Sequence, residues 1–273
     1  MIRITEQPSK YRHLEKMSVT EITSHINNED KTVSQAIEQV LPQINNLIEA
    51  VIAKMKQGGR LFYLGAGSGG RLSVLDAIEL PTTYGVEKGL VNVILAGGAE
   101  RLLEALEEKE DDTLEGWEQL QKQEICSKDL VIGISASGTT PFVLAALEQC
   151  HKHQVMTGCI VSNVKSPIAK VADYPVEVIT GPEFVTGSTR MKCGTAQKMI
   201  FDMISTTTMI RLGKVEDNSM VNVKLINDKI IDRSVKMLMQ KTDLKDYEEA
   251  KNMLLMHGSV KNALIQFVEK PNA

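Results

Sequence analysis

The sequence predicts an α/β protein with a doubly wound, five-stranded parallel sheet, preceded by N-terminal helices and followed by a small C-terminal helical segment. Short apolar runs alternate with helical patterns from residue 60 to residue 180, and two of these runs end in glycine- and serine-rich loops. Such alternation is typical of strands joined by helical crossovers, which makes the strands parallel. We therefore divide the chain into an N-terminal arm with helices (1–58), the sheet domain (59–215) and a C-terminal helical segment (216–273).

The N-terminal part combines a polar arm with helical patterns. Residues 1–17 are polar, so we expect them to be poorly ordered or wrapped on a partner. Two helices are then expected, at 19–27 and 33–56, and in the second the apolar residues recur every three or four positions. Two glycines, Gly58 and Gly59, end the second helix before the first strand.

The remaining elements follow from the order of apolar runs and helical patterns. Five strands are expected, at 60–64, 91–96, 129–134, 156–162 and 175–179. Helices are expected between them, at 70–79, 99–108, 113–123, 141–151 and 167–172. A long apolar helix at 191–212 and three short helices between 221 and 268 complete the chain. Because the long helix has little polar surface, we expect it to be buried against a second copy in a homodimer.

Composition and charge argue against several classes of protein. The chain has 273 residues, 42% of them hydrophobic, and a net charge of −4, whereas nucleic-acid binding usually needs a basic face. No apolar run reaches membrane-spanning length, and the N-terminus lacks the apolar stretch of a signal peptide. The four cysteines form no CxxC pair, and the five histidines are scattered without ligand spacing. We expect a cytoplasmic protein with no metal site and no nucleic-acid or membrane partner.

Two loops, at 65–71 and 135–141, carry the strongest functional signal. Each follows an apolar run and precedes a helical pattern, so each aims backbone N–H groups and the positive end of a helix dipole at one point. That arrangement suits a phosphate, and the hydroxyls of Ser135, Ser137 and Thr140 can add hydrogen-bond donors. The two loops together predict a site for a small phosphorylated molecule.

A dinucleotide site is the first alternative, because Gly65 to Gly70 matches the GxGxxG fingerprint. That fingerprint also requires an acidic residue at the end of the second strand, where it holds the ribose hydroxyls. Here the second strand ends in Gly97 and Gly98, and Glu87 lies before the strand. We therefore expect no nicotinamide cofactor, and the reaction considered below needs no other cofactor.

The second loop, Ser135-x-Ser137-Gly138-x-Thr140, resembles the phosphate loop of sugar isomerase (SIS) domains, which bind phosphosugars on a doubly wound five-stranded parallel sheet. Longer segments resemble the N-acetylmuramic acid 6-phosphate etherase family, over a span from about Thr5 to Val223. These segments are 65–72, 75–81, 181–198 and 209–215. More diverged forms of the same signatures occur in the glucokinase regulatory protein, which binds sugar phosphates without converting them.

The resemblance implies two catalytic glutamates, with Glu79 as the acid and Glu110 as the base. Glu79 is expected at the C-terminal end of the helix that begins at the first loop, where the helix dipole raises the pKa of a carboxyl. Phosphate and sugar would contact Gly67, Ser68, Gly69, Ser135, Ser137, Thr139, Thr140 and Glu183. The family usually has serine where this chain has Gly69, so one expected hydroxyl donor is absent.

The resemblance also implies a reaction. A lyase of this family would cleave the D-lactyl ether of N-acetylmuramic acid 6-phosphate by elimination and then hydration, giving D-lactate and N-acetylglucosamine 6-phosphate. Two alternatives stay open: an aldose–ketose phosphosugar isomerase, and a non-catalytic sugar-phosphate sensor. Release of D-lactate would distinguish the etherase from both.

Overall fold

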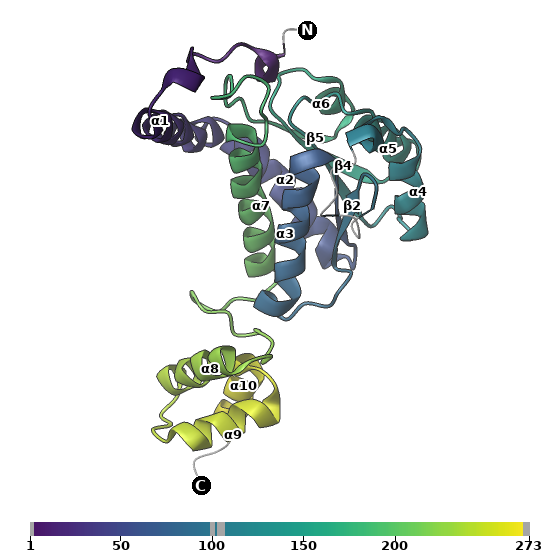
Figure 1. Cartoon of the computed structure of the whole chain (residues 1–273). Coiled ribbons are helices and arrows are strands. Elements are labelled where there is room, and N and C mark those ends of the chain that lie inside the picture. The colour runs from purple at the N-terminus through teal and green to yellow at the C-terminus, as the bar shows by residue number, and fades with distance from the viewer. Residues whose placement is uncertain (1–2, 99–101, 103–106, 270–273) are drawn as a thin grey trace. The chain divides into compact units, whose positions relative to one another are not determined.

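A five-stranded parallel sheet forms the centre of the fold, which confirms the predicted α/β class (Figure 1). The computed structural model describes residues 3–98, 102 and 107–269. The strands are β1 (Leu61–Gly65), β2 (Val91–Leu95), β3 (Leu130–Ser135), β4 (Met156–Val161) and β5 (Tyr174–Glu177), in the order β2-β1-β3-β4-β5. Each strand lies within about two residues of its predicted position, because buried apolar runs are a strong local signal.

Helices cover both faces of the sheet, and the strand residues alternate between them. Phe62 and Leu64 of β1 face a core shared with α4 (Glu115–Lys122), α5 (Pro141–Lys152) and α6 (Pro167–Val171). Tyr63 faces the other side, where its ring lies 5.1 Å from that of Phe201 in α7 (Lys192–Arg211). All residues of β1 and β3 are buried, as expected of central strands in a doubly wound sheet.

The N-terminal helices break at a different place from the predicted one. Helix α1 (Val19–Glu38) begins with a capping box between Ser18 and Glu21, and α2 (Leu41–Lys56) follows after a short break. Pro42 explains the break, since proline lacks a backbone N–H and its ring clashes with the carbonyl four residues earlier, whereas the first turn of a new helix tolerates it. The expected break at 28–32 is wrong: this polar stretch is helical.

The N-terminal arm (residues 3–17) lies against its own chain, so the expectation of a poorly ordered segment or of one wrapped on a partner is wrong. The backbone N–H groups of Ile4 and Thr5 donate to Asn163 Oδ1. Further along, Ser9 Oγ donates to the Phe184 carbonyl over 2.7 Å. These contacts join residues far apart in sequence, which local polarity cannot reveal.

Helix α3 (Gly67–Tyr84) is longer than the predicted helix at 70–79. It continues through Pro81 because Leu80 and Tyr84 extend its buried face. Gly85, at φ +65°, then ends it. The helix at 99–108 falls largely outside the described residues, and Glu107–Asp111 form a short 3-10 helix.

Helix α7 buries most of its apolar residues within its own chain. The buried apolar residues are Cys193, Ala196, Ile200, Phe201, Ile204 and Met209. The side turned to solvent carries Thr195, Lys198 and Asp202. Because these apolar residues are already buried within the chain, they are not evidence for a second copy. The homodimer therefore stays a prediction.

The chain divides into two compact units, the first comprising Met1–Ala77 and Gly89–Ser205 and the second Ile78–Lys88 and Thr206–Ala273. The second contains the three predicted short helices, α8 (Asp228–Lys241), α9 (Tyr247–His257) and α10 (Val260–Glu269), which pack together (Figure 1). Their shared core includes Val235, Leu238, Leu254 and Val260. The three-part division predicted from the sequence stays a proposal.

Candidate active site

The candidate site lies where the strand order reverses. Strands β1 and β3 are neighbours, yet the chain leaves β1 toward β2 on one side and reaches β3 on the other. In doubly wound sheets, ligands bind at the carboxyl ends of the strands at this switch point. The two loops that follow β1 and β3 border a pocket of about 190 Å³ there. Its lining residues are Glu6, Ala66, Gly67, Ser68, Gly69, Glu110, Ile134, Ser135, Ala136, Ser137, Thr140, Gly187, Thr189 and Gln197.

Hydroxyl groups gather in the second loop. Ser135 Oγ lies 2.8 Å from Thr140 Oγ1 and 3.2 Å from Ser137 Oγ. The backbone N–H of Gly138 donates to Ser135 Oγ, and that of Thr139 donates to Ser137 Oγ. These bonds hold three hydroxyls at the start of α5, where the helix dipole favours an anion.

Glycines allow both loops to turn tightly. Gly138 has φ +71°, and a Cβ on it would come within 2.3 Å of Ser166 Oγ. In the first loop, a Cβ on Gly70 would meet Leu95 at 2.5 Å and the Gly65 backbone at 2.8 Å. Larger residues at either position would displace the loop that borders the pocket.

At Gly69, where the family usually has serine, other side chains already occupy the space that a side chain would need. A Cβ there would lie 2.7 Å from Ile134 Cγ2 and 2.8 Å from Gln197 Oε1. Gln197 itself lines the pocket, so its amide occupies the space beside the missing hydroxyl. Serine at this position would require the Gln197 side chain to move.

Glu110 is the member of the acidic run that reaches the pocket. Its Oε1 lies 2.7 Å from where a Cβ on Gly67 would be, whereas Glu107 and Glu108 are exposed. Burial raises the pKa of Glu110, and the Glu107 charge adds to the rise, while Arg71 opposes it. A carboxyl with a raised pKa beside a loop of hydroxyls at a helix N-terminus is suited to proton transfer.

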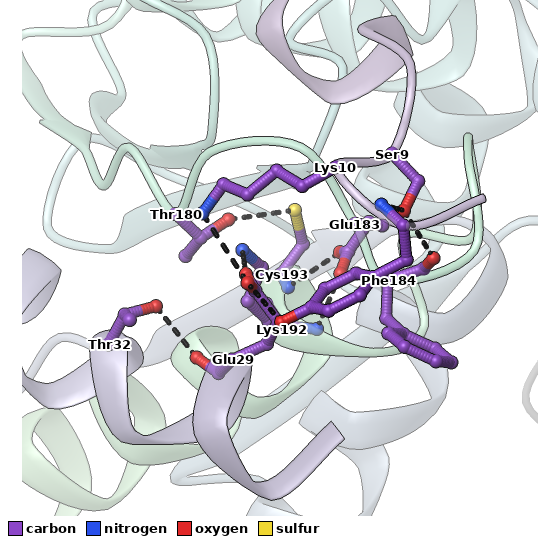
Figure 2. A network of polar contacts seen from close by, with 10 residues as sticks. Ser9, Lys10, Glu29, Thr32, Thr180, Glu183, Phe184, Lys192 and Cys193 are labelled. Atoms are coloured by element: carbon purple, nitrogen blue, oxygen red, sulfur yellow. Dashed lines mark hydrogen bonds and ion pairs between the residues drawn. The ribbon is translucent and has the colours of Figure 1, made fainter. Parts of the chain in front are cut away.

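Three predicted site residues are not among those that line the pocket. Glu183 is buried, and its two oxygens accept the backbone N–H groups of Lys192 (2.9 Å) and Cys193 (3.0 Å) at the start of α7 (Figure 2). Thr139 is half-buried, and its hydroxyl donates to Ser137. Glu79 belongs to the second unit. Its side chain is exposed, and it lies five residues before the end of α3 rather than at the end itself. The dipole argument for Glu79 is therefore wrong.

The pocket also contains residues that the sequence analysis did not select. Gly187, Thr189 and Gln197 belong to a segment quoted for the family resemblance, so that segment was the available signal. Glu6 had no such signal, because it belongs to the polar arm. Within the described residues, no group of His, Cys, Asp and Glu side chains could hold a metal ion. No helix in the described part of the chain is long and apolar enough to cross a membrane.

Comparison with known proteins confirms the expected family. Residues 43–151 match the glucokinase regulatory protein N-terminal SIS domain, and residues 117–206 match the SIS domain. A phosphoheptose isomerase from Francisella tularensis has a similar structure, with a TM-score of 0.52 at 16% identity, covering 70% of this chain and 99% of its own. That likeness shows the fold alone.

Two relatives extend the similarity over nearly the whole chain. An N-acetylmuramic acid 6-phosphate etherase from Porphyromonas gingivalis is 53% identical over 269 residues, covering 98% of each chain. Another, from Bacteroides thetaiotaomicron, is 53% identical over 263 residues, covering 96% of this chain and 95% of its own. The chain therefore belongs to the N-acetylmuramic acid 6-phosphate etherase family.

Proposed function

We propose that this protein is a carbon–oxygen lyase that cleaves the D-lactyl ether of N-acetylmuramic acid 6-phosphate, releasing D-lactate and leaving N-acetylglucosamine 6-phosphate. One observation carries the proposal: in a chain 53% identical to etherases, a carboxyl with a raised pKa lines the same pocket as the phosphate-loop hydroxyls. The phosphate would bind at Ser135, Ser137, Thr140 and the backbone near Ser68. The role would be recycling or scavenging of cell-wall sugars in the cytoplasm.

The chemistry follows from the substrate. An ether is hard to hydrolyse directly, because an alkoxide is a poor leaving group. The open-chain sugar has an aldehyde at C1, which makes the C2 proton acidic. A base removes that proton, the C2–C3 double bond forms, and an acid protonates the lactyl oxygen as it leaves C3. Water then adds to the unsaturated aldehyde, so two carboxyls in opposite protonation states suffice without a cofactor.

Glu110 is our candidate for the base and Glu79 for the acid. Glu110 lines the pocket, which supports contact with the sugar. Glu79 is exposed on α3 beside Ile78, whose exposed fraction is 61%, and Leu75 on the same helix is 48% exposed. Exposed apolar residues beside an acid suit a surface covered by a second copy, so we propose a homodimer in which this face of α3 is an interface.

A sugar-phosphate sensor is the second candidate, favoured by the match of residues 43–151 to the glucokinase regulatory protein domain. A sensor needs the phosphate loops but has no use for a carboxyl of raised pKa in the same pocket. An aldose–ketose isomerase would need such a group, since it also begins by removing the C2 proton. We place the etherase first because the relatives over the whole chain are etherases.

The test is incubation of the purified protein with N-acetylmuramic acid 6-phosphate in heavy water, followed by an assay for D-lactate. The etherase releases D-lactate and incorporates deuterium at C2. An isomerase would give a ketose without lactate, and a sensor would bind without turnover, so either result would refute the proposal. Glu79→Gln should block lactate release, since an amide cannot protonate the leaving oxygen, whereas Glu110→Gln should block C2 exchange as well.

A further inference from the structure

The N-terminal arm brings to the pocket a second carboxylate that the proposed mechanism does not use. Glu6 ends the short 3-10 helix Ile4–Glu6 and lines the same pocket as Glu110 and the two phosphate loops. Its Oε2 lies 3.7 Å from the position that a Cβ on Gly187 would occupy. Glu6 and Gly187 therefore adjoin in one part of the pocket wall.

A buried asparagine fastens this part of the arm to the second phosphate loop. Asn163 is fully buried, and its Nδ2 donates to Thr5 Oγ1 over 3.0 Å. The same amide donates to the carbonyls of Ala136 (3.3 Å) and Ser137 (3.1 Å) in the loop. Because Glu6 follows Thr5, the Asn163 side chain positions both the backbone of the loop and the residue next to Glu6.

A buried ion pair fastens the rest of the arm (Figure 2). Lys192 Nζ lies 2.6 Å from Glu29 Oε2, and both residues are buried. Glu29 Oε1 accepts from Lys10 Nζ at 3.4 Å and from the Tyr11 hydroxyl at 3.2 Å. Burial alone would raise the pKa of Glu29, but Lys192 and Lys10 hold it below its ordinary value. The arm is thus tied to the first turn of α7 as well as to the loop.

The chemistry of the pocket limits what Glu6 can bind. The loops offer backbone N–H groups and hydroxyls, which suit the phosphate, and a carboxylate repels a phosphate. Glu6 must then face a part of the ligand that is neutral and rich in hydrogen-bond donors. The hydroxyl and amide N–H groups of an amino sugar fit that description, since a carboxylate only accepts.

We propose that Glu6 binds the sugar part of the substrate, accepting hydrogen bonds from its hydroxyl or amide N–H groups and so fixing the sugar beside Glu110. This inference rests on the proposed function, because it takes the pocket to hold a phosphorylated amino sugar. It makes the anchored arm a wall of the binding site.

The test is calorimetric titration of the full-length protein with two probes, N-acetylglucosamine 6-phosphate and inorganic phosphate. Glu6→Ala should weaken binding of the sugar phosphate about tenfold or more, since a hydrogen bond to a charged group is lost. It should leave binding of inorganic phosphate unchanged or tighter, because a nearby negative charge is removed. Glu6→Gln keeps one acceptor, so its affinity for the sugar phosphate should lie between those of the wild type and Glu6→Ala. Glu15→Ala, at an exposed position of the same arm, is the matched control and should change neither affinity.

Three outcomes would overturn the inference. Glu6→Ala could bind the sugar phosphate as the wild type does, or it could lose both probes equally, which indicates a structural role. The wild type could also bind inorganic phosphate but not the sugar phosphate. Failure of the proposed function is separate, since it appears as sugar-phosphate binding without release of lactate. If the wild type is active, Glu6→Ala should raise KM more than it lowers kcat.

Discussion

Asp76 allows a quantitative test of the packing between α3, α7 and β1. Its carboxylate is half-buried between these elements and accepts hydrogen bonds from Tyr63 Oη (3.0 Å) and Ser205 Oγ (2.8 Å). Burial raises the pKa of Asp76 from 3.8 to about 6, and these two hydrogen bonds oppose the rise. The folded protein therefore holds the proton more tightly than the unfolded chain does. The stability from this group is present below pH 3.8 and is lost as the pH rises through about 6.

The rise of the Asp76 pKa from 3.8 to about 6 corresponds to about 3 kcal/mol of unfolding free energy, which the protein loses between about pH 4 and pH 7. Asp76→Asn removes the titration, and a hydroxyl facing the new NH₂ group can accept from it. We expect the stability of the variant relative to wild type to rise by about 3 kcal/mol from pH 4 to pH 7 in urea denaturation. Asp30→Asn, at an exposed position of α1, controls for the loss of one charge. If the difference in unfolding free energy between Asp76→Asn and the wild type stays constant with pH, the reasoning is refuted.

Three other predictions concern the site. Ser137→Ala should weaken binding of a sugar phosphate by about 1.5–3 kcal/mol in calorimetry, whereas Thr139→Val, at a position that does not line the pocket, should have a smaller effect; equal losses would mean that Thr139 also contacts the ligand. Glu110→Gln should lower kcat by about 10²–10⁴-fold while sugar-phosphate affinity persists, and near-native turnover would mean that the base is another residue. Glu183→Ala should lower the unfolding free energy by about 1–2 kcal/mol because α7 loses its cap; if Glu183 bound sugar instead, affinity would fall without this loss of stability.

The strands and the two glycine-rich loops could be predicted because their signals are local. A buried strand is a continuous apolar run, and Gly138 and Gly70 lie where the backbone itself requires glycine. The spacing of Ser135, Ser137 and Thr140 then determines which hydroxyls can meet at the start of α5. None of these inferences depends on a residue distant in the sequence.

Two of the errors in the fold involve contacts between distant residues. The polar stretch around Glu29 indicated a helix break, but Lys192, 163 residues away, compensates its burial and α1 continues. The arm looked disordered because its partner Asn163 lies 158 residues from Thr5. Pattern reading assigns polar residues to solvent, and it fails where a buried polar partner replaces the water.

The roles of the glutamates show the same limit in the candidate site. Glu183 belongs to a segment typical of the family, yet its two oxygens are occupied by backbone N–H groups of α7. Glu29 is likewise occupied, by Lys192, Lys10 and Tyr11. Glu6 and Glu110 line the pocket, although one lies in a polar arm and the other in an acidic run. What separates a structural carboxylate from a candidate for substrate binding here is whether the chain's own donors fill its oxygens, and only the folded chain decides that.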